Sequence, residues 1–137
     1  MKEKTINGIT LKAVGTEKDV YFDMAKTMFD EIVYHNERNE KTVMIVPVGP
    51  TDQYPILADM INKGNVSLKK VHFFNMDEYM LSPSEIIPET DPLCFKGRMN
   101  REFYSRIRPD LVMPESQRHF PKVGCEAEYD KMLEDLG

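Results

Sequence analysis

The chain has 137 residues, of which 41% are hydrophobic and 30% charged, with a formal net charge of -5, which is typical of one soluble globular domain and excludes a disordered chain. Acidic and basic residues are mixed along the chain without a sustained basic stripe, which argues against a nucleic-acid partner. No apolar run approaches the ~20 residues of a membrane span and the first residues lack a secretory signal, so we expect a cytoplasmic protein with no membrane partner.

The first half of the chain predicts strands that alternate with helices. Its central strands are almost continuously apolar, as in sheets that helices cover on both faces. Strands and helices in this order are joined by right-handed crossovers, which gives a parallel sheet. The predicted elements are an edge-type strand over 9–14, a helix from Thr16 to about His35, a strand over 42–47, a helix over 53–63 closed by Gly64, and a strand over 69–75.

The second half predicts irregular segments and two more helices. Prolines make 80–92 a long loop, a helix follows over 93–107, and a connector leads to a last amphipathic helix over 126–136. We therefore predict one domain over 1–137 in the α/β class, Rossmann-like, with three αβα layers and a mostly parallel sheet that looks truncated. An uncovered sheet edge would favour association with a second copy, or with a missing C-terminal half.

Polar residues follow two of the predicted strands. Asn75 ends the third predicted strand, Asp77, Glu78 and Tyr79 follow it, and the turn 48–54 follows the second strand. In open α/β sheets the ligand crevice lies outside the carboxyl ends of the strands, so we expect these residues to face a ligand. Without further context, an Asp-Glu pair at a strand end is more often a solvated turn than a catalytic site.

The motifs at these strand ends resemble those of the glucosamine-6-phosphate deaminase (isomerase) family. They are the turn Gly49-Pro50-Thr51, the helix exit Lys63-Gly64-Asn65-Val66-Ser67, and the string Asn75-Met76-Asp77-Glu78-Tyr79. Further along, Asp91-Pro92-Leu93-Cys94-Phe95, Met99 and Arg101-Glu102-Phe103-Tyr104 are similar to the family's His-Pro-x-Ser-Tyr, Met and Arg-x-Phe-Phe pattern. The resemblance covers most of the chain and identifies it with the N-terminal part of that fold.

The resemblance implies conversion of glucosamine 6-phosphate to fructose 6-phosphate and ammonia, without a metal or an organic cofactor. The family's enolising base corresponds to Asp77, which a strand end would hold rigidly. The phosphate-binding turn corresponds to Gly49, Pro50 and Thr51, where backbone amides and a hydroxyl would meet the anion. Glu78 corresponds to a substrate-binding position as well. Because side chains alternate along a strand, however, Glu78 should lie on the side opposite Asp77, where it would have a structural or supporting role. The expected partner is a sugar phosphate, and the family suggests a homo-oligomer.

The turn departs from the family pattern at two positions. Pro50 lacks an amide donor, and Asp52 adds a negative charge. At an effective dielectric of about 20, a unit charge about 4 Å from a phosphate costs on the order of 4 kcal/mol. Asp52 should therefore face away, be paired, or indicate another ligand. The family's ring-opening histidine, its partner carboxylates and a phosphate-binding lysine would lie beyond Gly137.

Two other functions remain as alternatives. A lactone hydrolase of the phosphogluconolactonase type shares the fold, but that family has an arginine where Tyr79 stands. A non-catalytic sugar-phosphate sensor is the third candidate. Taken without the family motifs, Gly49 and Thr51 would more often serve turn formation and helix capping than anion binding.

The remaining histidines and cysteines predict no catalytic role. We expect His35 and His119 at the surface and His72 in the core or at a sheet edge. Cys94 and Cys125 lack the spacing of metal ligands or of a disulfide scaffold, so we expect two ordinary thiols.

Overall fold

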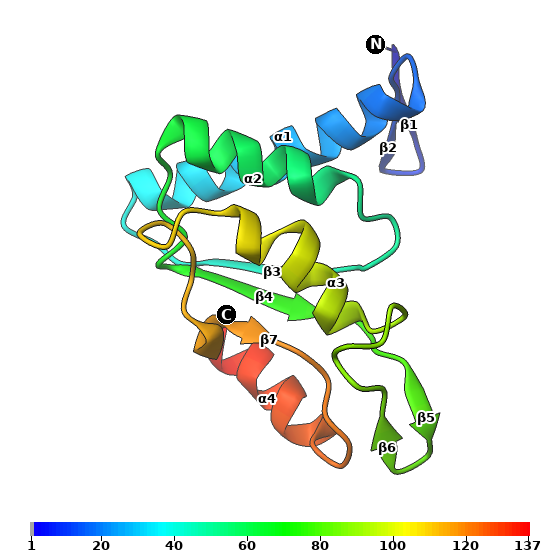
Figure 1. The fold of residues 1–137 in the computed structure, drawn as a ribbon. Coiled ribbons are helices and arrows are strands. Elements are labelled where there is room, and N and C mark those ends of the chain that lie inside the picture. Colours follow the sequence, from blue (N-terminus) through cyan, green and yellow to red (C-terminus); the bar gives the residue numbers. More distant parts are fainter. Residues whose placement is uncertain (1) are drawn as a thin grey trace.

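The computed structural model describes residues 2–137, in which a three-stranded parallel sheet lies between helices (Figure 1). The sheet has the order β3–β4–β7, with α1, α2 and α3 on one face and α4 on the other. The predicted αβα architecture is thereby confirmed. The elements are β1 (Lys2–Ile6), β2 (Ile9–Ala13), α1 (Glu17–Glu37), β3 (Thr42–Val46), α2 (Gln53–Gly64), β4 (Val71–Asn75), β5 (Met80–Ser82), β6 (Glu85–Ile86), α3 (Phe95–Glu102), two short 3₁₀ helices (Tyr104–Arg106, Glu115–Gln117), β7 (Arg118–His119) and α4 (Glu126–Leu136).

Side-chain alternation along β4 divides the interior between the two faces of the sheet. Phe73 points toward α2 and α3, where its ring lies 5.5 Å from that of Phe103. Phe74 points the other way, and its ring meets that of Tyr129 on α4 edge to face at 5.3 Å. Both phenylalanines are fully buried, so β4 is the central element of the fold.

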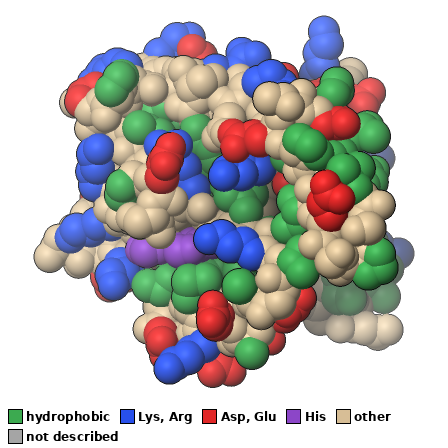
Figure 2. Space-filling view, turned by 60° about the horizontal axis from the view of Figure 1, so that its bottom comes forward, with side chains coloured by type: hydrophobic (Ala, Val, Ile, Leu, Met, Phe, Trp, Pro, Cys, Tyr) green, Lys and Arg blue, Asp and Glu red, His purple; other side chains and the backbone are tan. Residues whose placement is uncertain are grey.

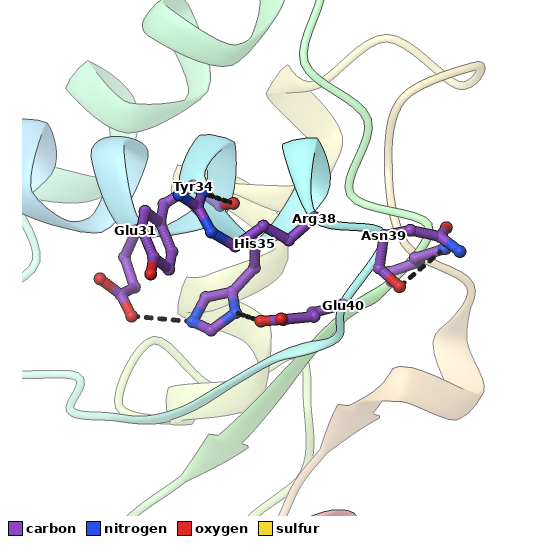
Figure 3. A network of polar contacts seen from close by, with 7 residues as sticks. Glu31, Tyr34, His35, Arg38, Asn39 and Glu40 are labelled. Atoms are coloured by element: carbon purple, nitrogen blue, oxygen red, sulfur yellow. Dashed lines mark hydrogen bonds and ion pairs between the residues drawn. The ribbon is translucent and has the colours of Figure 1, made fainter.

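Helix α1 begins and ends with well-defined polar contacts. At its start Thr16 and Asp19 form a capping box, as the sequence predicts for Thr16. At its end His35 lies between two carboxylates, at 2.9 Å from Glu31 and 2.9 Å from Glu40 (Figure 3).

Helix α2 includes Gly64, and Asn65 rather than Gly64 takes the left-handed conformation that ends it, with φ 53°.

The strand predicted over 9–14 exists but does not join the parallel sheet. It is β2, which pairs antiparallel with β1 in a separate hairpin whose residues are all exposed. The hairpin turn is Asn7-Gly8, where both residues have positive φ, 52° and 80°. Asn-Gly is the preferred pair for such a turn, so the sequence did carry this signal.

Three further predictions about the second half are corrected. The loop predicted over 80–92 contains the short hairpin β5–β6, with Met80 opposite Ile86. The helix predicted over 93–107 stops at Glu102, because Phe103 leaves the helical conformation and continues into a 3₁₀ turn. The connector contains β7, which is two residues long and supplies the third strand of the sheet. Within residues 2–137, no helix combines the length and the apolar character needed to cross a membrane.

Candidate active site

The carboxyl ends of β3 and β4 lie side by side because the two strands are parallel and in register. Val46 pairs with Asn75 at the last position of both strands. The alignment continues one residue further, since the Met76 amide donates to the Val46 carbonyl at 3.1 Å. The two segments that the sequence singled out, one after each strand, therefore start from the same edge of the sheet.

A small cavity lies between these two segments. It has a volume of about 260 Å³ and is open to solvent. Gly49 and Asp77, which are 28 positions apart in the chain, both contribute to its wall, as the resemblance leads us to expect. Its lining residues are Pro47, Val48, Gly49, Met76, Asp77 and Phe95.

The turn after β3 brings its three predicted residues to different depths. Gly49 and Pro50 are exposed, whereas Thr51 is buried and its carbonyl accepts the amide of Tyr54 at 3.0 Å. Asp52 caps α2 without a side-chain hydrogen bond and is exposed. The negative charge expected to oppose a phosphate thus lies at the solvent-facing start of α2.

Asn75 and Tyr79 were expected to face a ligand, but neither lines the cavity. The Asn75 side chain is 1% exposed and, within residues 2–137, neither of its amide atoms has a hydrogen-bond partner. The Tyr79 ring is half-exposed and packs against the Phe95 ring at 4.9 Å. Of the four polar residues Asn75, Asp77, Glu78 and Tyr79 at the end of β4, Asp77 is the one that lines the cavity with Gly49.

Glu78 connects the end of β4 to the start of α3. Its carboxylate accepts the amide of Phe95 at 2.8 Å and that of Lys96 at 2.9 Å, and the Cys94 thiol donates to it at 3.5 Å. These contacts satisfy backbone donors in the first turn of α3. The supporting role fits this geometry, whereas substrate binding by Glu78 stays a prediction.

Phe95 lines the cavity but was not among the predicted site residues. An aromatic residue in the predicted helix over 93–107 is typical of the core, and the Phe95 side chain is indeed partly buried against the core. The first residue of α3, however, also faces Asp77 and Gly49 across the cavity. The family motif around 91–95 was the signal that could have identified it.

A separate hollow of about 390 Å³ lies between α3 and β7 and carries charges of both signs. Lys96, Arg118 and Lys122 line it together with Glu89 and Glu115. Lys96 pairs with Glu89 at 3.4 Å, and Arg118 donates to the Met113 carbonyl at 2.7 Å. Two of its three cationic side chains are thus already engaged.

The histidines and cysteines lie outside the cavity at the strand ends. His72 is partly buried on β4, as expected, and His119 is also partly buried, because its ring stacks on that of Phe74 with the centroids 4.0 Å apart. Cys94 and Cys125 are both free, and burial raises the pKa of the Cys94 thiol. Within residues 2–137, no three side chains of the metal-binding types come together.

Comparison with known proteins gives a likeness in fold to a solved structure. No family model matches the chain, and no curated protein does. A solved structure of a monomeric glucosamine-6-phosphate deaminase, described as a missing link of the NagB superfamily, is similar with a TM-score of 0.72 and 20% sequence identity. The likeness covers 90% of this chain and 49% of that chain, so this chain spans about half the length of that structure. The resemblance seen in the sequence is thereby confirmed for the fold.

Proposed function

We propose that the cavity at the ends of β3 and β4 binds an amino-sugar phosphate and that Asp77 is the base that enolises it. The observation that carries the proposal is the meeting of Gly49 and Asp77 in one cavity of about 260 Å³. The fold shared with a glucosamine-6-phosphate deaminase supports the same class of reaction, an aldose–ketose isomerisation with loss of ammonia.

The chemistry requires one base on the C1–C2 edge of the open-chain sugar. The Asp77 carboxylate would take the proton from C2 while the aldehyde oxygen O1 takes up a proton, which gives an enolamine. A proton would then return at C1 as the nitrogen loses one, which leaves an imine at C2. Water then hydrolyses the imine left at C2, which gives fructose 6-phosphate and ammonia. The phosphate would lie at the turn of Gly49, Pro50 and Thr51. Among the residues that the structure describes, those lining the cavity include no histidine to open the ring, so we expect turnover to be limited by the open-chain fraction of the sugar.

The test is release of ammonia from glucosamine 6-phosphate in a coupled assay. We expect Asp77→Asn to lower the rate at least ~100-fold, the usual contribution of a positioned acid or base, with little change in substrate affinity. Asp59→Asn, an exposed acid on α2, is the matched control and should leave the rate unchanged. An equal rate in the Asp77 variant would refute the assignment of the base.

The sensor alternative has its own observation in support. Pro50 offers no amide to a phosphate, and Asp52 is exposed beside the turn. Saturable binding of glucosamine 6-phosphate without ammonia release would favour the sensor. No feature of the cavity favours the lactone hydrolase. Association into a homo-oligomer, or with a missing C-terminal half, also stays a prediction.

A further inference from the structure

Two histidines meet on the face of the sheet that α4 covers. Nδ1 of His72, on β4, lies 3.1 Å from Nε2 of His119, on β7. Their ring planes differ by 8°, and the ring centroids are 5.4 Å apart. Rings that are nearly parallel, with facing nitrogens much closer than the centroids, lie edge to edge. One imidazole therefore donates an N–H to the other, which accepts it.

This pair lies where β4, β7 and α4 join. The Phe74 ring stacks on His119 with centroids 4.0 Å apart, and Tyr129 of α4 packs on the edge of the same phenylalanine. The Tyr129 hydroxyl donates to the carbonyl of His119 at 3.2 Å and to that of Asn75 at 2.6 Å. Figure 2 shows histidine side chains on this face of the molecule, with basic side chains beside them and hydrophobic side chains below.

The surroundings favour neutral imidazoles. Burial lowers the pKa of His72, and the charge of Lys41 lowers it further. Burial and the neighbouring His72 lower the pKa of His119. Within residues 2–137, neither ring accepts or donates a hydrogen bond to a carboxylate. The other titratable or charged side chains that line the hollow beside His119 are Glu115, Arg118, Lys122, Cys125, Glu128 and Tyr129.

We propose that the His72–His119 pair is a pH-sensitive clasp, which holds β7 and α4 on the sheet and releases them when both imidazoles are protonated. The N–H···N bond accommodates one added proton, because an imidazolium still donates to a neutral ring. A second proton leaves two N–H groups facing each other with no acceptor and two like charges in contact. When the clasp opens, each histidine is free to bind its own proton, so acid favours the open form.

Release of α4 from the sheet would also affect the carboxyl end of β4, which is followed by Asp77. Tyr129 binds the carbonyl of Asn75, two residues before Asp77. Loss of α4 from the sheet removes that contact. The clasp itself does not depend on the proposed function, and its test uses no substrate.

The test is amide hydrogen exchange of the full chain, followed by NMR between about pH 5 and pH 7.5 and corrected for intrinsic exchange rates. Well below about pH 6.5 the open form holds two protons on the histidines and the closed pair holds at most one. Opening therefore takes up at least one proton, and the exchange rate should rise about tenfold or more for each unit by which the pH falls. We expect this dependence for the amides of 129–136 in α4, whereas amides in the middle of α2 should show none. Wild-type exchange at α4 that is independent of pH after correction would overturn the proposal.

Variants separate the clasp from other titrations. The double variant His72→Gln, His119→Gln removes both ring protons and should abolish the pH dependence at α4. His35→Gln, at the end of α1, is the matched control and should retain it. In the wild type, NMR titration of the ring protons should place the second protonation of the pair at least one pH unit below the first. A dependence that survives the double variant, or two rings that titrate together near pH 6.5, would each contradict the clasp.

Discussion

Neighbouring carboxylates after β4 have different surroundings. Asp77 lies on the wall of the cavity, whereas the oxygens of Glu78 accept two backbone amides of α3. Adjacent residues of an extended chain point to opposite sides, and this separates a group free to meet a ligand from one that is held in place. The sequence indicated the division through strand alternation, but the capping contact needs α3, whose position the sequence does not give.

Removal of the Glu78 carboxylate should loosen the start of α3. We expect Glu78→Ala to lower the free energy of unfolding by about 0.5–2 kcal/mol, the usual range for a lost helix cap, as measured by urea unfolding. The Cys94 thiol, now 2% exposed, should react faster with a thiol reagent, while Cys125 reacts as before. Glu85→Ala, an exposed carboxylate on β6, is the control. An unchanged rate at Cys94 would show that Glu78 does not hold α3.

His35 has a pH dependence opposite in sign to that of the histidine clasp. Hydrogen bonds to Glu40 and then to Glu31 raise the pKa of His35 above its ordinary value of about 6.5. A raised pKa in the folded state means that stability from this group is complete below about pH 6.5 and is lost as pH rises through the raised pKa. His72 and His119, whose pKa values are lowered, bind protons below that window and do not interfere.

We expect the free energy of unfolding of the wild type to fall between about pH 6.5 and pH 8.5. In His35→Gln this fall should be smaller. Urea unfolding at a series of pH values measures it. Lys26→Gln, which breaks an exposed ion pair on the same helix, is the control and should leave the pH dependence unchanged. Equal slopes for wild type and His35→Gln would contradict the contribution of Glu31 and Glu40.

At the scale of elements, α3 is positioned by a close backbone contact. A methyl group at Gly97 would lie 2.3 Å from the carbonyl oxygen of Glu89 and 3.2 Å from Nη1 of Arg101. A glycine inside a helix lowers the stability of that helix relative to alanine. The structure shows that a glycine is needed there for α3 to pass the segment before it.

The substitution Gly97→Ala therefore has two opposite effects on stability: a higher helix propensity and a steric clash with the backbone of Glu89. Alanine gains up to ~1 kcal/mol in a helix interior, but overpacking against backbone costs about 1–3 kcal/mol. We expect a net loss in the free energy of unfolding of about 1–2 kcal/mol in a urea titration. Arg98→Ala, exposed on the same helix, should change little. A more stable Gly97→Ala protein would mean that α3 does not approach Glu89 closely.

Elements with strong periodicity could be predicted, and short ones could not. The apolar strands β3 and β4 and the helices α1, α2 and α4 carry enough residues for a period of 2 or 3.6 to be visible. β7 has two residues and exists because β4 offers it backbone partners, which no local pattern records. The sequence analysis predicts β2 as a strand but not its partner β1, although the Asn7-Gly8 pair between them is typical of a hairpin turn.

At the scale of the whole molecule, the site follows from the parallel arrangement of β3 and β4. The sequence could place Gly49 and Asp77 at one edge because parallel strands end together. It could not place Phe95, which reaches the cavity through the path of the chain after β6. The sheet also has an uncovered part, since Ile45 on β3 is 61% exposed on the face where α4 covers Phe74.

The most direct test of the account is a titration of the ¹⁵N-labelled chain with glucosamine 6-phosphate, followed by amide chemical shifts. The account predicts saturable shifts around the cavity, at Gly49, Thr51, Met76 and Asp77, and no comparable shifts at Lys96 or Lys122 in the hollow beside β7. Shifts confined to that hollow, or no saturable shifts at all, would contradict binding of a sugar phosphate at the ends of β3 and β4.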